Sequence, residues 1–410
     1  MDPTMVFLSN ATFVILFAIL VINFIFVLAG FFRKYPAGPA QPISIVIPAY
    51  NEEKNIAGCL ESALSASYPE AKEIIVVDDG SADRTREIVS GFRNVKIVLQ
   101  NHMGKVDAIN AGIRAAKNEI VVVMDADTVI KKNSLVEIAK HFSDGKMGAV
   151  SGVVTVLNRG WLGAFQNIEY ISTGLIKEGF SKLFSSNFGL FGAFSAYRKS
   201  AVEKVGGFKK TTETEDIDMS LLMKKSGYNS ITTTSAVGRA LAPEKMKGFL
   251  KQRSRWSKGI LQTITTHKDL VVKNGPLSYI ILVHYFWFVF SFLSIPILFY
   301  QFFYWLPYNF STIFDAGFYA FRWFSLFGPF FTLYMMPEWG FSIFSFFAVL
   351  SGIVTALVLF IGLKKVNEKI SLKTLICIFF YFPYTIILSI AMIIGAFRYF
   401  ASGGRGDFKK

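Results

Sequence analysis

Three long stretches without a charged side chain constrain this sequence more than any other feature. They run from residue 5 to 32, from 279 to 314 and from 341 to 363. Each is longer than the roughly 18–20 apolar residues that cross a bilayer. The hydrophobic content of 52% is close to that of soluble domains, so the placement of these residues carries the argument. The chain is predicted to be an integral membrane protein, which excludes a soluble globular or a disordered one.

Charged residues are concentrated between the first two stretches. The segment 33–275 holds 34 of the 43 Lys and Arg residues and 24 of the 29 Asp and Glu residues. Its length suits one large domain or two small ones. It carries no zinc-finger, recognition-helix or aromatic–basic motif, so nucleic acid is not an expected partner. Anionic lipid headgroups and a polyanionic small substrate are the expected partners of the basic surface.

The flanks of the first stretch predict its orientation. Asp2 precedes it, and Arg33 and Lys34 follow it. A cleaved signal peptide would be shorter and would have its basic residues in front. The positive-inside rule therefore places the N-terminus outside and the polar domain in the cytoplasm. Four more spans are predicted, near 277–305, 317–336, 339–363 and 371–397.

Charge does not decide how many of these spans cross. If all four do, the basic residues at 364, 365 and 369 face outside and those at 398, 405, 409 and 410 face inside. If 317–336, which Arg322 and Pro329 interrupt, lies in the interface, the two groups exchange sides. We expect about five spans in total. The predicted divisions are an N-terminal helix (1–34), a cytosolic domain (35–238), an amphipathic interface segment (239–275) and a C-terminal membrane region (276–410).

The polar segment has the pattern of an α/β domain. Apolar strands are predicted at 43–47, 73–77, 95–99 and 119–124, alternating with helices that begin near 52, 83 and 105. Strands made almost entirely of Val and Ile are buried on both faces, which predicts a parallel sheet covered by helices. No G-x-G-x-x-G follows the first strand, so a dinucleotide-binding fold has no support.

Carboxylates follow the predicted strands at the edge where open α/β sheets bind ligands. Asp125 and Asp127 can share a Mg²⁺ or Mn²⁺ ion that also holds phosphate oxygens, or they can be solvated turn residues. Asp78 and Asp79 can accept hydrogen bonds from a nucleobase or ribose, or stabilise a turn. Lys105 can meet a phosphate at a helix N-terminus, or be a solvated lysine.

Two later segments also carry candidate chemistry. Glu215 and Asp216 lie in an acidic stretch, where like charges raise a carboxyl pKa toward values useful in a general base. The alternative is an acidic helix start capped by Thr214. The segment 252–256, Gln-Arg-Ser-Arg-Trp, interleaves cations with an aromatic ring. It is predicted to lie on the membrane surface, to bind a diphosphate and a sugar ring, or to do both.

In this order these segments resemble the membrane-embedded processive β-glycosyltransferases of family 2, the hyaluronan, cellulose, chitin and poly-N-acetylglucosamine synthases. The resemblance extends from Ser44 to Gly259. It implies a GT-A fold, a uridine-diphosphate sugar as donor and Mg²⁺ or Mn²⁺ as cofactor. It also implies that Asp216 is the catalytic base, with Glu215 beside it.

The resemblance assigns the remaining site residues in groups. It implies that Tyr50, Glu52 and Asp79 line the uridine pocket, with Asp78 nearby. It also implies that Lys105 contacts the diphosphate, and that Asp125 and Asp127 contact the ribose and the metal. Gln252, Arg253, Arg255 and Trp256 are implied to contact the diphosphate and the acceptor, and Gly192 and Ala193 to form the floor of the acceptor site. Ala193-Phe194 departs from the Gly-Pro or Gly-Ser of many relatives, which leaves the acceptor and product open.

The predicted function is a processive inverting glycosyltransferase that polymerises a UDP-sugar and translocates the β-linked product. N-acetylglucosamine is the first expectation for the sugar and glucose the second. The alternative is a single transfer to a lipid acceptor. A non-catalytic transporter or carbohydrate-binding protein would not need Asp125, Asp127 and Asp216 together. The expected location is the plasma membrane, and the expected partners are the donor, the growing polysaccharide or lipid acceptor, and membrane lipid; the sequence does not define an accessory subunit.

Overall fold

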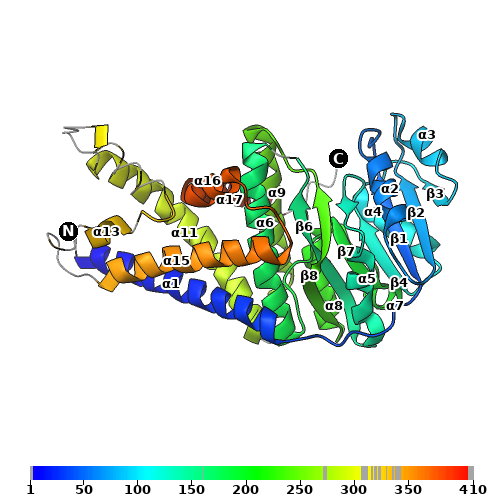
Figure 1. Ribbon diagram of the computed structural model, residues 1–410, viewed down its shortest axis with the longest axis horizontal. Helices are drawn as coiled ribbons and strands as arrows, with labels where there is room; N and C mark the ends of the chain where they lie inside the picture. Colours follow the sequence, from blue (N-terminus) through cyan, green and yellow to red (C-terminus); the bar gives the residue numbers. More distant parts are fainter. Residues whose placement is uncertain are drawn as a thin grey trace.

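Long apolar helices extend from one side of an α/β domain (Figure 1). The structure is a computed structural model that describes residues 3–158, 160–270, 275–305 and 343–404, with short pieces at 313–314, 317, 321, 325–328, 330–334 and 337. Within these residues, four helices are long and apolar enough to cross a membrane. Their bounds are α1 Pro3–Phe32, α11 Gly275–Trp305, α15 Ile343–Lys365 and α17 Tyr381–Ala401.

The predicted span at 371–397 is two helices, which is a correction. Here α16 (Leu372–Phe379) ends where α17 begins, at Phe380. Pro383 has no N–H to donate to the carbonyl of Phe379 four residues earlier, so the helical hydrogen-bond pattern is interrupted at this point. The N–H of Leu326 bonds that carbonyl instead, at 2.7 Å. The predicted span at 317–336 lies largely outside the described residues, which include the short helix α13 (Phe330–Tyr334).

The first half of the domain forms the predicted parallel sheet. The neighbours β3, β2, β1 and β4 are parallel. Their runs of Val and Ile are buried on both faces, because α4 packs on one face and α2 on the other. The elements are β1 Ile43–Ala49, α2 Ile56–Ser65, β2 Lys72–Asp78, α3 Thr85–Ser90, β3 Val95–Leu99, α4 Lys105–Ala115 and β4 Ile120–Met124.

The second half, for which no strands were predicted, makes the sheet mixed. Within the described residues eight strands follow the order β3-β2-β1-β4-β7-β6-β8-β5. Strand β7 is antiparallel to both β4 and β6, and β5 is antiparallel to β8. Burial on both faces fixes neither strand direction nor partner. The elements are β5 Val129–Ile130, α5 Ser134–Ala139, the 3₁₀ turn Lys140–Ser143, β6 Met147–Val156, β7 Phe194–Arg198, α7 Lys199–Lys204, α8 Glu215–Lys225 and β8 Asn229–Ala240.

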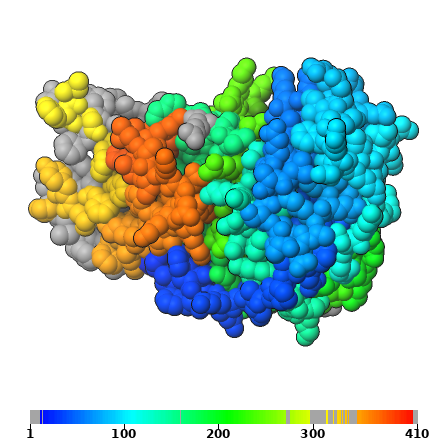
Figure 2. All heavy atoms as spheres, turned by 45° about the vertical axis from the view of Figure 1, so that its right-hand side comes forward, coloured from blue at the N-terminus to red at the C-terminus, as the bar shows by residue number. Residues whose placement is uncertain are grey.

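Two helices lie between the sheet and the membrane helices (Figure 1). They are α6 (Trp161–Phe184) and α9 (Met246–Thr266). Helix α1 packs on α6 so closely that a Cβ at Gly179 would lie 1.6 Å from the carbonyl oxygen of Phe26. Figure 2 shows the orange helices of the C-terminal region packed directly against the green part of the domain. The sheet, the two intermediate helices and the membrane helices therefore share one continuous packed body.

Candidate active site

The acidic residues after β4 meet Lys105 at the carboxyl edge of the sheet. The Nζ of Lys105, the first residue of α4, lies 2.7 Å from an oxygen of Asp125 and 3.3 Å from one of Glu215. Burial alone would lower the pKa of Lys105, but these two carboxylates hold it above its ordinary value. Lys105 thus joins two segments ninety residues apart in the chain.

Asp127 lies beside this ion pair in a strongly acidic environment. Burial, then the charges of Asp125 and Glu52, raise its pKa to about 7. Negative charges crowded in a buried place favour a bound cation. Within the described residues no three His, Cys, Asp or Glu side chains are placed to hold a metal ion together. Two carboxylates still suit Mg²⁺ or Mn²⁺, because such ions take further ligands from substrate phosphates and water.

Asp216 lies in the first turn of α8, held by two backbone N–H groups. Gly192 donates to its Oδ2 at 3.1 Å and Ile217 to its Oδ1 at 2.9 Å. Burial, followed by the charge of Glu215, raises the pKa of Asp216 to about 6, although Lys177 and Lys105 oppose this rise. A carboxylate with a raised pKa that is still ionised near neutral pH is suited to accept a proton.

Lys177 is a cation of this site that the sequence did not single out. It lies on α6, with its Nζ 4.8 Å from the centroid of the Phe191 ring. Burial lowers its pKa to about 8, and Asp216 limits that fall. An ordinary lysine in a long amphipathic helix gives no signal of this role, because only the packing of α6 under the 191–194 loop brings it here.

The loop before β7 joins the two acidic groups through its backbone. The N–H of Asp125 donates to the carbonyl of Ala193 at 3.1 Å. Its neighbour Gly192 donates to Asp216, and a Cβ there would stand 3.2 Å from that carboxylate. The predicted acceptor floor therefore lies between the predicted metal-binding and base residues.

Helix α9 holds the segment that precedes α8. The carboxylate of Glu213 pairs with Lys258 at 2.8 Å, and its carbonyl accepts from Arg255 at 2.8 Å. Its N–H donates to the side chain of Gln262 at 2.9 Å. Gly259 makes close approach possible, because a Cβ there would meet Thr214 at 2.6 Å. The base-bearing turn and the basic helix are thus one unit.

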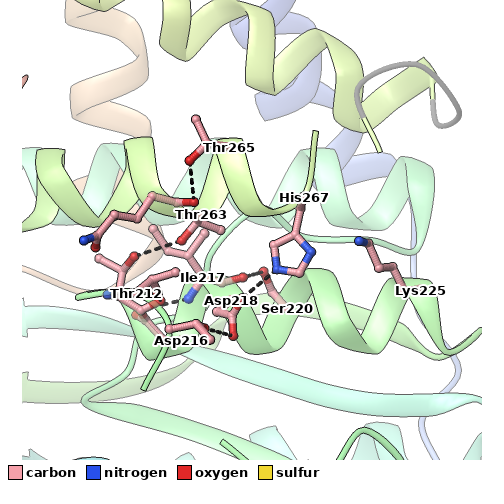
Figure 3. Close-up of polar contacts among 12 residues, drawn as sticks. Thr212, Asp216, Ile217, Asp218, Ser220, Lys225, Thr263, Thr265 and His267 are labelled. Carbon is pink, nitrogen blue, oxygen red and sulfur yellow. Dashed lines mark hydrogen bonds and ion pairs between the residues drawn. The ribbon is translucent and has the colours of Figure 1, made fainter. Parts of the chain in front are cut away.

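A second contact joins α8 to the end of α9 (Figure 3). The Nε2 of His267 lies 2.6 Å from Asp218, two residues beyond Asp216, and both side chains are buried. Thr211 donates to the other oxygen of Asp218 at 3.2 Å. This pair fixes the first turn of α8 against the end of α9.

Arg253 has different surroundings from Gln252, Arg255 and Trp256 in the 252–256 segment. Arg253 pairs with Glu169 at 2.7 Å and lies 4.3 Å from the Trp256 ring centroid. Gln252, Arg255 and Trp256 line the main cavity, whereas Arg253 is not one of its lining residues. Arg253 therefore lies behind Trp256, where it supports the ring.

The predicted uridine residues lie at the ends of β1 and β2. Asp79 is buried and accepts N–H groups from Met103 at 2.9 Å and Gly104 at 2.8 Å. Burial raises its pKa, but these bonds and the Gln100 amide outweigh it and hold the pKa below its ordinary value. Tyr50 stacks on His102 with centroids 4.0 Å apart.

The other two members of that group are near but separate. Asp78 accepts the N–H of Ser81 at 3.0 Å and lines a second cavity of about 520 Å³. Glu52 accepts from the side chain of Asn55 at 2.8 Å. Its pKa is raised by burial, and the charge of Asp125 adds to the rise.

One large cavity joins the domain to the membrane helices. Its volume is about 1020 Å³. Its domain side includes Lys105, both aspartates of the 125–127 turn, Gly192, Ala193 and Asp216. It continues to α1 at Asn23 and Phe26, and to α11 at Tyr279 and Trp287. Tyr170, Lys177, Glu213 and Arg398 also line it and were not singled out as site residues in the sequence.

Comparisons with known proteins agree with this geometry. Residues 44–206 match the family model described as Glycosyl transferase family 2. The chain is 36% identical over 250 residues to the poly-β-1,6-N-acetyl-D-glucosamine synthase of Staphylococcus epidermidis, covering 59% of this chain and 60% of that one. It is 35% identical over 228 residues to the enzyme of the same name from Staphylococcus aureus strain COL, covering 53% and 54%. The chain thus matches little more than half the length of these relatives.

A solved structure shows the same fold over almost the whole chain. It is a mannosyltransferase of Pyrobaculum calidifontis in complex with GDP-Man and Mn²⁺, with a TM-score of 0.60. The two share 17% identity, and the match covers 97% of this chain and 98% of the other. At this identity the likeness shows the fold alone, and it confirms the predicted GT-A type. Residues 44–206 are thus similar to glycosyltransferase family 2, and the α/β domain that contains them has a GT-A type fold and is joined to the membrane helices.

Proposed function

We propose that this protein polymerises N-acetylglucosamine from UDP-N-acetylglucosamine into a β-linked polysaccharide and passes the product into the membrane region. The observation that carries this proposal is the cavity that runs from the 125–127 turn to α1 and α11. The names of the two staphylococcal relatives support the sugar. The aromatic rings of Phe26, Tyr279 and Trp287 along the cavity suit the apolar faces of a sugar chain.

Asp216 takes the proton of the acceptor hydroxyl in the proposed reaction. The hydroxyl oxygen attacks the anomeric carbon as the bond to the diphosphate breaks on the opposite face, so the configuration inverts. The leaving diphosphate needs no proton, which makes one carboxylate sufficient, unlike the two that a glycosidase uses. Lys105 and Arg255 offset the charge that develops on it. Asp125 and Asp127 would hold the metal ion, which supplies further positive charge to the diphosphate.

Trp256 and the 191–194 loop are proposed to hold the acceptor. Trp256 lines the cavity with Arg253 behind it. Gly192 and Ala193 stand between the two acidic groups, where the sugar at the reacting end would lie. Tyr50, Glu52, Asp78 and Asp79 are proposed to surround the uridine. The domain is proposed to face the cytosol, with the N-terminus outside, because Arg33 and Lys34 follow α1.

The test offers the purified full-length protein Mg²⁺ or Mn²⁺ with radiolabelled UDP-N-acetylglucosamine, UDP-glucose or UDP-glucuronate, singly and in pairs. A long product from UDP-N-acetylglucosamine alone is expected. The Asp216→Asn variant is the matched control and should form no long product. A product that requires two donors would overturn the homopolymer. Label that moves only into added lipid would instead establish the single transfer.

A further inference from the structure

Helix α17 differs in direction from the other helices that are long enough to span. Figure 1 shows α1, α11 and α15 extending away from the sheet, while α17 stays close to α9 and α6. Length and composition alone would allow α17 to cross. Its contacts indicate otherwise.

Helix α9 lies against the glycosyltransferase domain along its whole length. Near its start Arg253 pairs with Glu169, and in its middle Lys258 pairs with Glu213 at 2.8 Å. Immediately after its end His267 contacts Asp218 at 2.6 Å. Every part of α9 is therefore on the side of the membrane that holds the domain.

Helix α17 runs beside α9 over the same length. The Tyr384 ring lies 5.6 Å from that of Phe249, and the Tyr399 hydroxyl bonds Thr265 at 3.2 Å. Between them Gly395 allows close packing, since a Cβ there would lie 2.7 Å from the carbonyl oxygen of Ser254. At 1.5 Å per residue, these contacts span about 22 Å of α17 and about 24 Å of α9, so the helices run side by side.

Both ends of α17 contact the domain side. Near its start Tyr384 donates a hydrogen bond to Glu169 of α6. Near its end Arg398 donates to Ser254 at 3.0 Å, and just beyond it the carbonyl of Gly404 accepts from Gln262 at 3.2 Å. A helix that crosses would place its ends about 30 Å apart along the membrane normal. Both ends of α17 contact α6 or α9, which lie on the domain side, so α17 cannot cross the membrane in this way.

The helix before α16 returns to the same side. Lys365, at the end of α15, pairs with the buried Glu178 of α6 at 2.6 Å. Glu368 pairs with Arg239 at 3.2 Å, and Lys131 donates to the carbonyl of Val366 at 2.7 Å. The loop between α15 and α16 is thus anchored on the domain.

We propose that α17 lies in the membrane leaflet next to the domain and does not cross, with one face in the lipid acyl chains. That face carries Phe397, exposed at 63%, and Phe400, exposed at 71%, together with Phe382, Ile390 and Ile394. The opposite face, with Ala391 and Gly395, is buried.

This arrangement resolves the charge balance that the sequence left undecided. The basic residues at 364, 365 and 369 and the Arg at 398 lie on one side in the structure. These residues can therefore all lie on the cytosolic side, as the positive-inside rule requires. The proposal does not depend on how the chain runs between the end of α11 and the start of α15.

The first test measures sidedness in full-length protein in intact cells. Single cysteines are introduced as Lys369→Cys and Gly403→Cys, and a third variant has a cysteine appended after Lys410. Lys132→Cys reports the side of the domain and Ile313→Cys the far side. The native Cys59 and Cys377 are buried, so their background reaction with a membrane-impermeant maleimide is small.

We expect the three reporters to react only under the conditions in which Lys132→Cys reacts. Reaction of Gly403→Cys or of the appended cysteine together with Ile313→Cys would overturn the proposal. The appended cysteine keeps the test decisive if a substitution at 403 prevents accumulation.

A second test measures how deep three positions of α17 lie in the bilayer. Phe382→Cys, Ile390→Cys and Phe397→Cys each carry a fluorophore and are quenched by nitroxide lipids of known depth. A helix lying in one leaflet gives the three positions similar depths. A crossing helix places Ile390 deepest and the other two near opposite surfaces, which would refute the proposal.

Discussion

Substitution of Lys177 is the sharpest test of how the site sets the pKa of Asp216, the proposed base. In Lys177→Met the aliphatic stem is kept and the ammonium is lost. The charge of Lys177 is the largest influence that lowers the pKa of Asp216, acting against burial and Glu215. The pKa of Asp216 is therefore expected to rise in the variant, and the rate is expected to fall on the acid side of the pH profile.

The size of the effect follows from titration. Asp216 has an ordinary pKa of 3.8, raised to about 6 in the protein. A nearby opposite charge shifts a carboxyl pKa by about 1–3, and taking about 1 for a cation that also stacks on a ring places the variant near 7. A base acts only when ionised. At pH 6.5 the ionised fraction falls from about 76% to about 24%, roughly threefold, whereas at pH 8.5 it changes by only a few per cent.

The assay is initial-rate release of UDP with polymer formation, from pH 5.5 to 9, with Lys177→Arg as the matched control that keeps the charge. Glu215→Gln should shift the acid limb in the opposite direction, because it removes a negative neighbour of Asp216. An unchanged acid limb in Lys177→Met, or one moved to lower pH, would show that Lys177 does not act on the base. A purely structural role would lower the rate equally at all pH values.

Three further predictions rest on single contacts. Asp216→Asn should lower the rate at least about a thousandfold while UDP binding, measured by calorimetry, stays within about twofold; near-normal turnover would remove Asp216 from the role of base. Gly179→Val should lower the Tm by about 5 °C or more, because the new valine side chain would collide with the carbonyl of Phe26. Gly160→Ala should leave the Tm unchanged, because a Cβ at Gly160 has no heavy atom within 4 Å. Equal Tm values for the two variants would contradict the close packing of α1 on α6. Asp127→Asn should raise the Mn²⁺ concentration for half-maximal rate at least about tenfold, and an unchanged metal titration would place the ion elsewhere.

The first half of the domain was predictable because its signal is local. Runs such as 120–124 have no polar residue to place on a solvent face, so they had to be buried strands. The second half was not predictable in the same way. Strand β7 is a short segment of mixed residues, and its direction depends on β4 and β6, whose paired residues lie 70–78 and 44–48 positions earlier in the chain.

The site residues likewise differ in whether a local sequence pattern reveals them. Asp125, Asp127 and Asp216 could be proposed because paired carboxylates stand out in sequence, and in the structure all three line the same cavity. Lys177 and Tyr170 could not be proposed in this way, because α6 contributes them through packing that no spacing encodes. Arg253 shows the converse: adjacent in sequence to cavity residues, it points to Glu169 because successive helix positions face different directions.

The three bonds from α9 to Glu213 have a kinetic consequence. Arg255, Lys258 and Gln262 hold the carbonyl, the carboxylate and the N–H of Glu213, three positions before Asp216. A shift of α9, which is proposed to contact the leaving diphosphate, would therefore carry Asp216, the proposed base, with it. Under the proposed function, departure of UDP and placement of Asp216 for the next sugar would therefore be coupled through the three bonds between α9 and Glu213.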